Sequence, residues 1–191
     1  MKRIAIFASG SGTNAQNIIE YFNKSDKINV VLVLSNNKNA FVLERAKKLN
    51  VPSVTFDREQ FYQSEYVVDL LLANKIDLIV LAGFLRLVPK NILQLFQNKI
   101  INIHPALLPK YGGKGMYGLK VHETVIENKE TESGISIHYV NEEYDKGDVF
   151  FQTKCRVDPS DTPEILAQRV HQLEYEHFPK QIEKLLNKQN Q

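Results

Sequence analysis

The stretch "RIAIFASGSGTN", residues 3–14, joins an apolar run to a glycine-rich turn. Residues 3–9 lack regular polar alternation, as expected for a parallel strand covered on both faces. Gly10 and Gly12 follow, where glycine lets the backbone turn sharply and approach a ligand closely. A buried strand that leads through such a turn into a helical segment indicates the first unit of an α/β sheet.

The same alternation continues along the chain. Further apolar, β-branched runs typical of buried strands occupy residues 28–35, 52–56, 77–83 and 99–104. Segments with helical spacing lie between the runs, at residues 15–23, 40–50, 62–74 and 89–96. This alternation predicts an open, doubly wound, mostly parallel sheet.

The pattern changes near the C-terminus. Residues 134–140 and 148–157 are strand-like, and the polar loop between them is too short for a helical crossover. We therefore expect a C-terminal antiparallel hairpin. A final helix is predicted from Pro163, with a kink or break at Pro179 and fraying at 187–191.

Composition and charge indicate one domain that acts on small molecules. The chain has 191 residues, 43% of them hydrophobic, and a formal net charge of +2, which suits a single domain over 1–191. Its charges form no basic block, so we expect no nucleic-acid partner. Cys155 is the single cysteine, which fits a reducing compartment. Without a signal-peptide pattern or a run of membrane length, we predict a cytoplasmic protein with no membrane partner.

The loop at residues 9–14 is a candidate anion site. Its glycines and the N–H groups of the following helix start suit a phosphate. Residues 10–15 also match the pattern G-x-G-x-x-A, which suggests a nicotinamide dehydrogenase. However, the second strand ends in "VLSNNKN", residues 33–39, without the acidic residue that would bind the cofactor ribose. A phosphate cradle is favoured, and a turn that binds nothing is the alternative.

The stretch "KIINIHPALLPKYGG", residues 99–113, carries Asn102 and His104 at the end of a predicted strand. Side chains two apart share one face, so both are expected at the crevice beyond the strand ends. An amide N–H₂ and an imidazolium N–H could together stabilise an oxyanion. In the alternative, Asn102 caps the turn before Pro105 and His104 bonds a buried carbonyl.

Two acidic residues are candidates for the same site. Asp145, beside Gly147 in the hairpin loop, would raise the pKa of His104 and keep its imidazole charged, with Asp148 as a rival. An ordinary hairpin turn is the alternative. Glu174 lies at the edge of the apolar stripe of the final helix, where it could accept hydrogen bonds from sugar hydroxyls or remain a rim residue.

Several motifs in one order carry a family resemblance. They are "IAIFASGSGTN", "IVLAGFLRLVP", "INIHPALLPKYGGKG", "GISIHYVNEEYDKGDV" and "RVHQLEYEHFP". Over nearly the whole chain the sequence resembles the folate-dependent phosphoribosylglycinamide formyltransferases of purine biosynthesis. The N-I-H-P and L-L-P elements are typical of the wider group that uses 10-formyltetrahydrofolate, and S-G-S-G-T-N of the member that binds a ribose phosphate. The resemblance implies a formyltransferase-like variant of the Rossmann fold.

The resemblance also implies a reaction. The formyl group of the co-substrate 10-formyltetrahydrofolate would pass to the amine of 5'-phosphoribosylglycinamide, without a metal or a covalent enzyme intermediate. Asn102 and His104 would hold the oxyanion. Asp145 would support His104 and help position a water that shuttles the proton.

Binding roles follow from the same resemblance. Substrate would be bound by Gly12, Thr13, Asn14 and Glu174. Folate would be bound by Arg86, Leu87, Val88, Asn141 and Glu142. Ser136 and His138 would support the site, and Lys110 and Lys114 are further candidate phosphate contacts. Residues 1–98 would form the phosphate-binding half and 99–191 the folate-binding and catalytic half of a monomer or weak homodimer.

The sequence also allows us to compare other possible functions. A methionyl-tRNA formyltransferase would need a further C-terminal domain, and a formyltetrahydrofolate deformylase a domain before the first strand. A non-catalytic nucleotide-binding module would explain the glycine-rich loop alone. A zinc hydrolase built on His104, His122 and His138 lacks the usual ligand spacing. A cis bond would fit at Leu108-Pro109, which stands in a tight turn.

Overall fold

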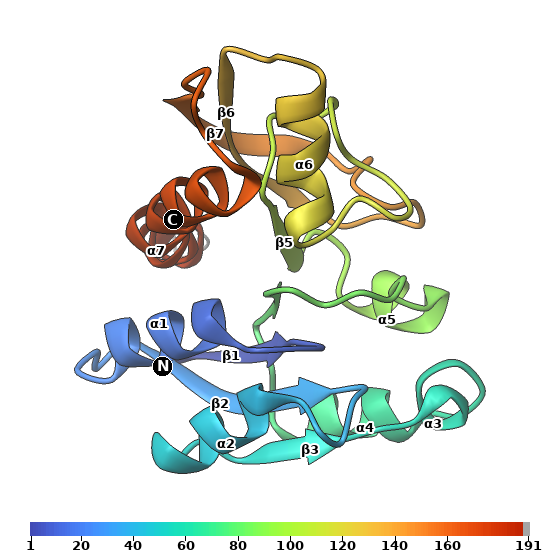
Figure 1. Ribbon diagram of the computed structural model, residues 1–191. Coiled ribbons are helices and arrows are strands. Elements are labelled where there is room, and N and C mark those ends of the chain that lie inside the picture. The colour runs from blue at the N-terminus through green and yellow to red at the C-terminus, as the bar shows by residue number, and fades with distance from the viewer. Residues whose placement is uncertain (189–191) are drawn as a thin grey trace.

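The computed structural model describes residues 1–188, which form one seven-stranded sheet with helices on both faces (Figure 1). The strands are β1 (Lys2–Phe7), β2 (Ile28–Ser35), β3 (Ser53–Thr55), β4 (Leu78–Leu81), β5 (Ile100–His104), β6 (Glu132–Tyr139) and β7 (Val149–Arg156). The helices are α1 (Thr13–Phe22), α2 (Phe41–Lys48), α3 (Arg58–Tyr62), α4 (Tyr66–Ala73), α5 (Lys90–Leu95), α6 (Leu119–Glu127) and α7 (Pro163–Lys188). The expected fraying at 187–191 falls mostly outside the described residues.

The sheet confirms the predicted architecture. Its strand order is β3-β2-β1-β4-β5-β6-β7. Strands β1 to β5 pair in parallel, while β6 is antiparallel to both β5 and β7. The strand order reverses between β1 and β4. In open α/β sheets, ligands bind beyond the carboxyl ends of the strands at such a reversal.

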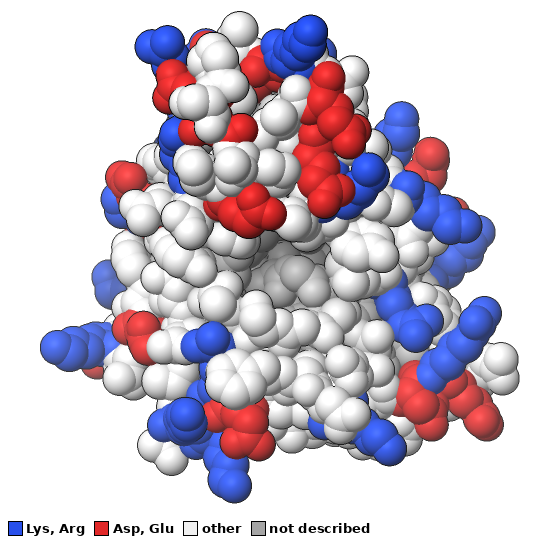
Figure 2. Space-filling view, in the orientation of Figure 1, with Lys and Arg blue, Asp and Glu red and all other residues white. Residues whose placement is uncertain are grey.

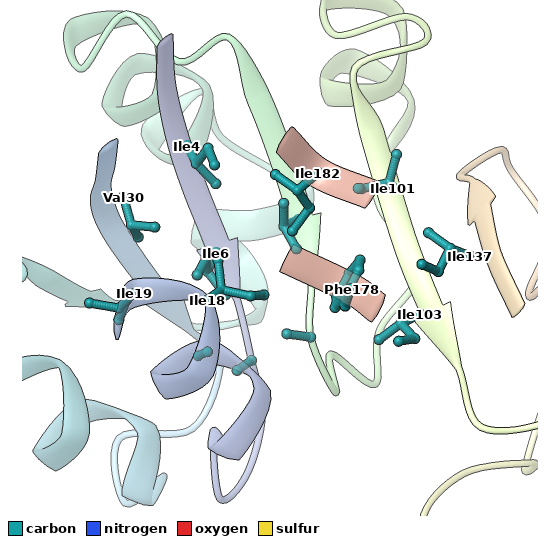
Figure 3. Packing of buried hydrophobic residues seen from close by; sticks show 14 of the residues in the cluster. Ile4, Ile6, Ile18, Ile19, Val30, Ile101, Ile103, Ile137, Phe178 and Ile182 are labelled. Carbon is teal, nitrogen blue, oxygen red and sulfur yellow. The ribbon is translucent and has the colours of Figure 1, made fainter. Parts of the chain in front are cut away.

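Two hydrophobic cores lie on opposite faces of the sheet. One is formed with α1, α2, α6 and α7, and the other with α3, α4 and α5. Phe178 and Ile182 of α7 are fully buried. Figure 3 shows Phe178 between Ile6 of β1 and Ile103 of β5. Because α7 packs across both halves of the sheet, side chains near its start can reach the crevice between β1 and β5.

Helix α6 is missing from the sequence prediction, which has no helix between 104 and 134. The helix starts directly after Gly118, at the end of the glycine-rich stretch 112–118 that is typical of a loop. Its buried face consists of Val121, His122 and Val125. So short a stripe, with a histidine inside it, gives a weak helical pattern.

The predicted helix at 62–74 is wrong in its start and its continuity. Asp57 begins α3 earlier, with a capping box in which its side chain and that of Gln60 each bond the other's backbone N–H. The hydroxyl of Ser64 then accepts a hydrogen bond from Tyr66 N–H at 3.3 Å, where α4 begins. Two separate helix starts therefore replace one long helix.

Helix α7 runs through Pro179, so the chain does not break there. Proline removes one backbone hydrogen bond and crowds the preceding turn. Here Phe178, Pro179 and Ile182 are all buried in the helix face that packs on the sheet. Tertiary packing of this face outweighs the local cost of the proline.

The surface in Figure 2 mixes charges of both signs. Lysine and arginine side chains are interspersed with acidic ones around the edge, and uncharged residues surround a hollow near the middle of this face. Among residues 1–188, we find no helix with the length and apolar character needed to span a bilayer.

Candidate active site

A cavity of about 740 Å³ lies at the carboxyl ends of β1, β4 and β5. The turns after these strands line it, together with the segment before α6, the first residues of α6, the hairpin loop and the first half of α7. The main lining stretches are 10–14, 82–85, 102–105 and 113–119. The predicted residues Gly12, Thr13, Asn14, Asn102, His104, Asp145 and Glu174 all line this cavity.

The glycine-rich loop turns into α1 at Gly12. This residue has φ 72°, a left-handed conformation that favours glycine. A Cβ atom at Gly12 would lie 2.4 Å from a methyl carbon of Val42 on α2. Glycine is therefore required here both by backbone conformation and by space. Thr13 and Asn14 form the first turn of α1, where backbone N–H groups have no intrahelical acceptor.

Strand β6 supports the end of β5. In their antiparallel pairing Asn102 lies opposite His138, and His104 lies opposite Ser136. The buried Ser136 hydroxyl donates to the Ala106 carbonyl at 2.6 Å and accepts from Leu108 N–H at 2.9 Å. Ser136 thus fixes the turn after His104.

The turn after β5 also contains the Leu108–Pro109 bond, which is cis and so agrees with the hypothesis that a cis bond would fit there.

Asp145, rather than Asp148, reaches His104. The nearest carboxylate oxygen of Asp145 lies 3.6 Å from His104 Nδ1, and the same oxygen accepts from Gly113 N–H at 2.9 Å. Gly147 lets the loop close on β6, because a Cβ there would stand 1.7 Å from the Tyr139 carbonyl oxygen. Asp148 is exposed and meets β6 through its backbone carbonyl.

The hydrogen bonds of His104 define its neutral form. Nε2 lies 2.7 Å from the Tyr111 carbonyl oxygen, which can only accept, so Nε2 carries a hydrogen. Nδ1 is then the atom that gains or loses the second proton. Its 3.6 Å separation from Asp145 is too long for a hydrogen bond. Protonation would therefore place an uncommitted N–H donor beside the Asp145 carboxylate.

The pKa of His104 departs from the expected direction. Burial lowers this pKa, and the opposing effect of the Asp145 charge and the Tyr111 carbonyl is smaller. Asp145 acts on this pKa in the expected direction, but its effect does not outweigh that of burial in the protein without ligands. The His104 side chain is only 5% exposed, and that desolvation penalises the imidazolium.

Asn102 is held by two neighbours. Its Nδ2 lies 3.1 Å from His138 Nε2 and 3.3 Å from Asp145 Oδ1. His138 Nδ1 lies 2.8 Å from the Tyr139 carbonyl oxygen and so carries the ring hydrogen, which leaves Nε2 as the acceptor for Asn102. The amide thus points its N–H₂ group into the cluster, but an oxyanion would have to replace one of these acceptors.

Asp145 remains ionised more readily than an ordinary aspartate. Burial acts to raise its pKa, but contacts with His138, His104 and the Gly113 N–H outweigh burial and lower it. A half-buried carboxylate next to two imidazoles makes this corner of the cavity polar.

Glu174 stands at the other end of the cavity, 4% exposed, between two polar side chains. Its Oε2 accepts from Asn14 Nδ2 at 2.8 Å and lies 2.8 Å from His171 Nδ1. The hydrogen bond with Glu174 raises the pKa of His171. Glu174 is thereby tied to Asn14, at the end of the glycine-rich loop.

His122 lines the cavity without an identified partner for one ring nitrogen. It is 2% exposed, and its Nδ1 has no hydrogen-bond partner among the described residues. Burial lowers its pKa to about 4. Within residues 1–188 no group of three or more histidine, cysteine or acidic side chains is arranged to hold a metal ion, so the geometry gives no support to a zinc site on His104, His122 and His138.

The predicted folate residues lie outside the cavity lining. Val88 is buried in the core formed with α3, α4 and α5, and the Leu87 carbonyl accepts from the Tyr62 hydroxyl at 2.9 Å. Glu142 pairs with Lys90 at 3.3 Å on the surface. Arg86 and Asn141 are likewise absent from the lining, although Leu85 and Tyr144, close to them in the sequence, belong to it.

The two candidate phosphate lysines differ. Lys114 lines the cavity, on the segment that precedes α6. Lys110 instead pairs with Glu130 at 2.8 Å and is not part of the lining. Of the two, only Lys114 is therefore placed to contact a ligand in this cavity.

Comparison with known proteins decides the family. A profile described as formyl transferase matches residues 2–182. The chain belongs to the formyl transferase family. Among related formyl transferases, a phosphoribosylglycinamide formyltransferase of Haemophilus influenzae is 38% identical over 184 residues, which are 94% of this chain and 84% of that protein. A chloroplastic phosphoribosylglycinamide formyltransferase of Arabidopsis thaliana is 42% identical over 175 residues, and this match spans 88% of this chain but 60% of that protein.

Solved structures of formyl transferases share the fold. A phosphoribosylglycinamide formyltransferase from Bacillus halodurans is 37% identical, with a TM-score of 0.85, and the match covers 97% of this chain and 95% of that one. A glycinamide ribonucleotide transformylase from Symbiobacterium toebii is 33% identical, also with a TM-score of 0.85, over 94% and 85% of the two chains.

Sequence reasoning missed His171 and the cavity role of His122. His171 stands three residues before Glu174 on the predicted final helix, and side chains at that spacing are neighbours on a helix. This spacing was a usable signal. His122 gave none, because it lies on α6, which the sequence pattern does not indicate.

Proposed function

We propose that this formyl transferase moves the formyl group of 10-formyltetrahydrofolate to the amine of 5'-phosphoribosylglycinamide, a step of purine biosynthesis. One observation carries the proposal: Asn102, His104 and Asp145 meet in a cavity that is also lined by the glycine-rich loop. A phosphate site and a cluster able to stabilise an oxyanion thus share one space of about 740 Å³. The names of the relatives agree with this reaction.

In the proposed mechanism the neutral amine attacks the formyl carbon directly. A new C–N bond forms while the carbonyl π electrons move to oxygen. The oxyanion takes the place of Asp145 Oδ1 as acceptor of the longer Asn102 contact, 3.3 Å in the structure. His104 takes up a proton from solvent at Nδ1 as the ligands bind, donates this N–H to the oxyanion, and returns the proton to solvent when the products leave. The negative charge of the oxyanion stabilises the imidazolium that burial alone disfavours.

Collapse of the intermediate completes the transfer. A water positioned by Asp145 carries the proton from the attacking nitrogen to N10 of the folate, the carbonyl re-forms and the bond from carbon to N10 breaks. Tetrahydrofolate and the formylated ribonucleotide leave. His104, Asn102 and Asp145 end the cycle in their starting protonation states, and neither a metal nor a covalent enzyme intermediate takes part.

The substrate lies across the cavity in this proposal. Its 5'-phosphate meets the backbone N–H groups of Gly12, Thr13 and Asn14, with Lys114 nearby. Its ribose hydroxyls donate to Glu174, which Asn14 and His171 hold in place.

The folate enters from the side of the hairpin loop. The backbone groups of 86–88 and 141–142 bind its pterin at the edge of the cavity, Arg86 meets its glutamate tail, and Phe84 and Tyr144 of the lining provide apolar contacts. Residues 1–98 then supply the phosphate half and 99–191 the folate and catalytic half of one domain, as a monomer or weak homodimer.

Product identification tests the reaction. We expect the protein, mixed with glycinamide ribonucleotide and 10-formyltetrahydrofolate, to yield formylated ribonucleotide by mass spectrometry and one tetrahydrofolate per formyl group transferred. Tetrahydrofolate released without ribonucleotide would indicate a deformylase, and formylation of methionyl-tRNA in a parallel reaction would indicate a different acceptor. Either result contradicts the proposal.

A further inference from the structure

Helix α2 donates two hydrogen bonds to the glycine-rich loop from the side away from the cavity. The Gly10 carbonyl accepts from Val42 N–H at 3.1 Å, and the Ser11 carbonyl accepts from Arg45 Nε at 2.8 Å. Val42 and Arg45 both belong to α2. The next carbonyl, of Gly12, accepts from Gln16 N–H at 2.9 Å within α1. Consecutive carbonyls of the loop are therefore turned away from the cavity.

The direction of each carbonyl fixes the direction of the following N–H. In a planar trans peptide the C=O and N–H bonds point in opposite directions. If the carbonyls of Gly10 and Ser11 point at α2, the N–H groups of Ser11 and Gly12 point at the cavity. Within the described residues no protein acceptor is found for either N–H group. These donors are thus oriented and free for a ligand.

Arg45 is the one side chain of α2 that makes such a contact and carries charge. Its guanidinium also bonds the Gln16 side chain on α1 and lies over the Phe41 ring, 4.9 Å from the centroid. Among residues 1–188 no acidic side chain forms a salt bridge with it. Its positive charge therefore stands behind the loop without a carboxylate to compensate it.

We propose that Arg45 is a positioning residue for the phosphate subsite. By donating Nε–H to the Ser11 carbonyl, it holds the peptide that joins Ser11 to Gly12 with the Gly12 N–H directed at the phosphate. The same hydrogen bond polarises that peptide and strengthens its N–H as a donor, and the guanidinium charge favours a bound dianion. Arg45 acts through the loop and does not itself touch the substrate.

The inference rests on the proposed function only in taking the loop as a phosphate site, so its test uses ribose 5-phosphate as well as the full reaction. Arg45→Met removes both the guanidinium donors and the positive charge. Arg45→Lys keeps the charge but lacks the planar guanidinium that bonds Ser11 and Gln16 together. Lys47→Met is the matched control, since Lys47 is an exposed cation on the same helix.

We expect Arg45→Met to raise KM for the ribonucleotide about tenfold, which is the loss of one charge-assisted contact. The kcat and the KM for the folate should stay within about twofold of wild type, and calorimetry should show the same loss of affinity for ribose 5-phosphate. Arg45→Lys should recover part of the loss, and Lys47→Met should behave as wild type. A purely structural role of Arg45 would lower the melting temperature without this selective change.

Two results would overturn the inference. One is an unchanged ribonucleotide KM in Arg45→Met, or a rise no larger than in Lys47→Met. The other is a wild-type protein that does not bind ribose 5-phosphate, since the loop would then not be a phosphate site. If wild type binds ribose 5-phosphate but forms no formylated product, the proposed reaction fails, and the Arg45 variants still test the positioning role through that affinity.

Discussion

The two ends of the cavity present different kinds of chemical group. At the loop of residues 10–14 the donors are backbone N–H groups, directed by a left-handed glycine and by contacts with α2. At the end of β5 the proposed reacting groups are the side chains of Asn102, His104 and Asp145, held within 3.6 Å of one another or of His138. Binding at the loop depends on the conformation of the backbone, whereas the chemistry proposed at the end of β5 depends on the charges of side chains.

This difference shows how each end can be damaged. Backbone donors do not titrate, so the loop should respond to changes of shape and hardly to pH. The buried cluster keeps its shape through β5 and β6, but its function depends on where a proton resides. Changes at the loop should therefore appear in ribonucleotide affinity, and changes at the cluster in the rate of the chemical step.

Apart from the loss of His104 itself, the largest expected effect comes from removing the charge of the cluster. Asp145→Asn keeps the size of the side chain and an acceptor for Gly113 N–H, but no longer stabilises the imidazolium. We expect kcat to fall by about 10²- to 10³-fold, with ribonucleotide KM nearly unchanged. The control is Asp148→Asn, an exposed neighbour in the same loop. Equal losses in the two variants would refute the special role of Asp145.

A shape change should damage the loop end next most strongly. Gly12→Ala places a Cβ 2.4 Å from a Val42 methyl carbon, at a φ of 72°. We expect a rise of about fivefold to a hundredfold in ribonucleotide KM, because left-handed strain and the clash together cost about 1–3 kcal/mol. Gly10→Ala is the matched control, since its Cβ would meet nothing within 4 Å. The prediction fails if both variants bind ribonucleotide alike.

A third experiment compares stability with pH in His122→Phe. In the folded protein the pKa of His122 is about 4, below the ordinary histidine value of 6.5. Between these values the unfolded chain binds the extra proton, so His122 makes the protein less stable as pH falls. Urea titrations at pH 7 and 4.5 give the decrease in the free energy of unfolding between these two pH values. Removing His122 should make this decrease smaller by about 1–2 kcal/mol. Parallel pH profiles of wild type and variant would contradict the shift.

The smallest expected effects are shifts in the pKa values of two histidines that line the cavity. Titration by nuclear magnetic resonance should give His104 a pKa below 6.5 and His171 a pKa above 6.5. Asp145→Asn removes the negative charge that favours the His104 imidazolium, so the His104 pKa should fall further. Glu174→Gln should lower the pKa of His171 and leave that of His104 less affected. A rise at His104 in Asp145→Asn would contradict the stated cause.

The sequence predicted the backbone end of the cavity more fully than its surroundings. Gly10 and Gly12 are conspicuous because only a few residue types tolerate such a turn, and the strands around them are continuous apolar runs. Asn102 and His104 could be placed on one face by strand periodicity. That Asp145 joins them was open, since only tertiary pairing of β5 and β6 brings the hairpin loop to the cavity.

What the sequence could not predict depends on long-range packing. The contact of Arg45 with the Ser11 carbonyl joins α2 to a loop 34 residues away, and no local pattern encodes it. The direction of the His104 pKa depends on the balance between burial and a nearby charge, which needs the folded environment. Helix α6 was not predicted because a glycine-rich start and a short apolar stripe are more typical of a loop.

The most direct test of the account is a single-turnover experiment with wild type and His104→Ala across ribonucleotide concentrations. The account predicts that the rate of tetrahydrofolate formation at saturation falls by about 10²- to 10⁴-fold, while the ribonucleotide concentration at half saturation stays within about twofold. A variant that keeps the wild-type rate, or one whose loss lies in half saturation instead, would contradict the division between a backbone site that binds and a side-chain cluster that reacts.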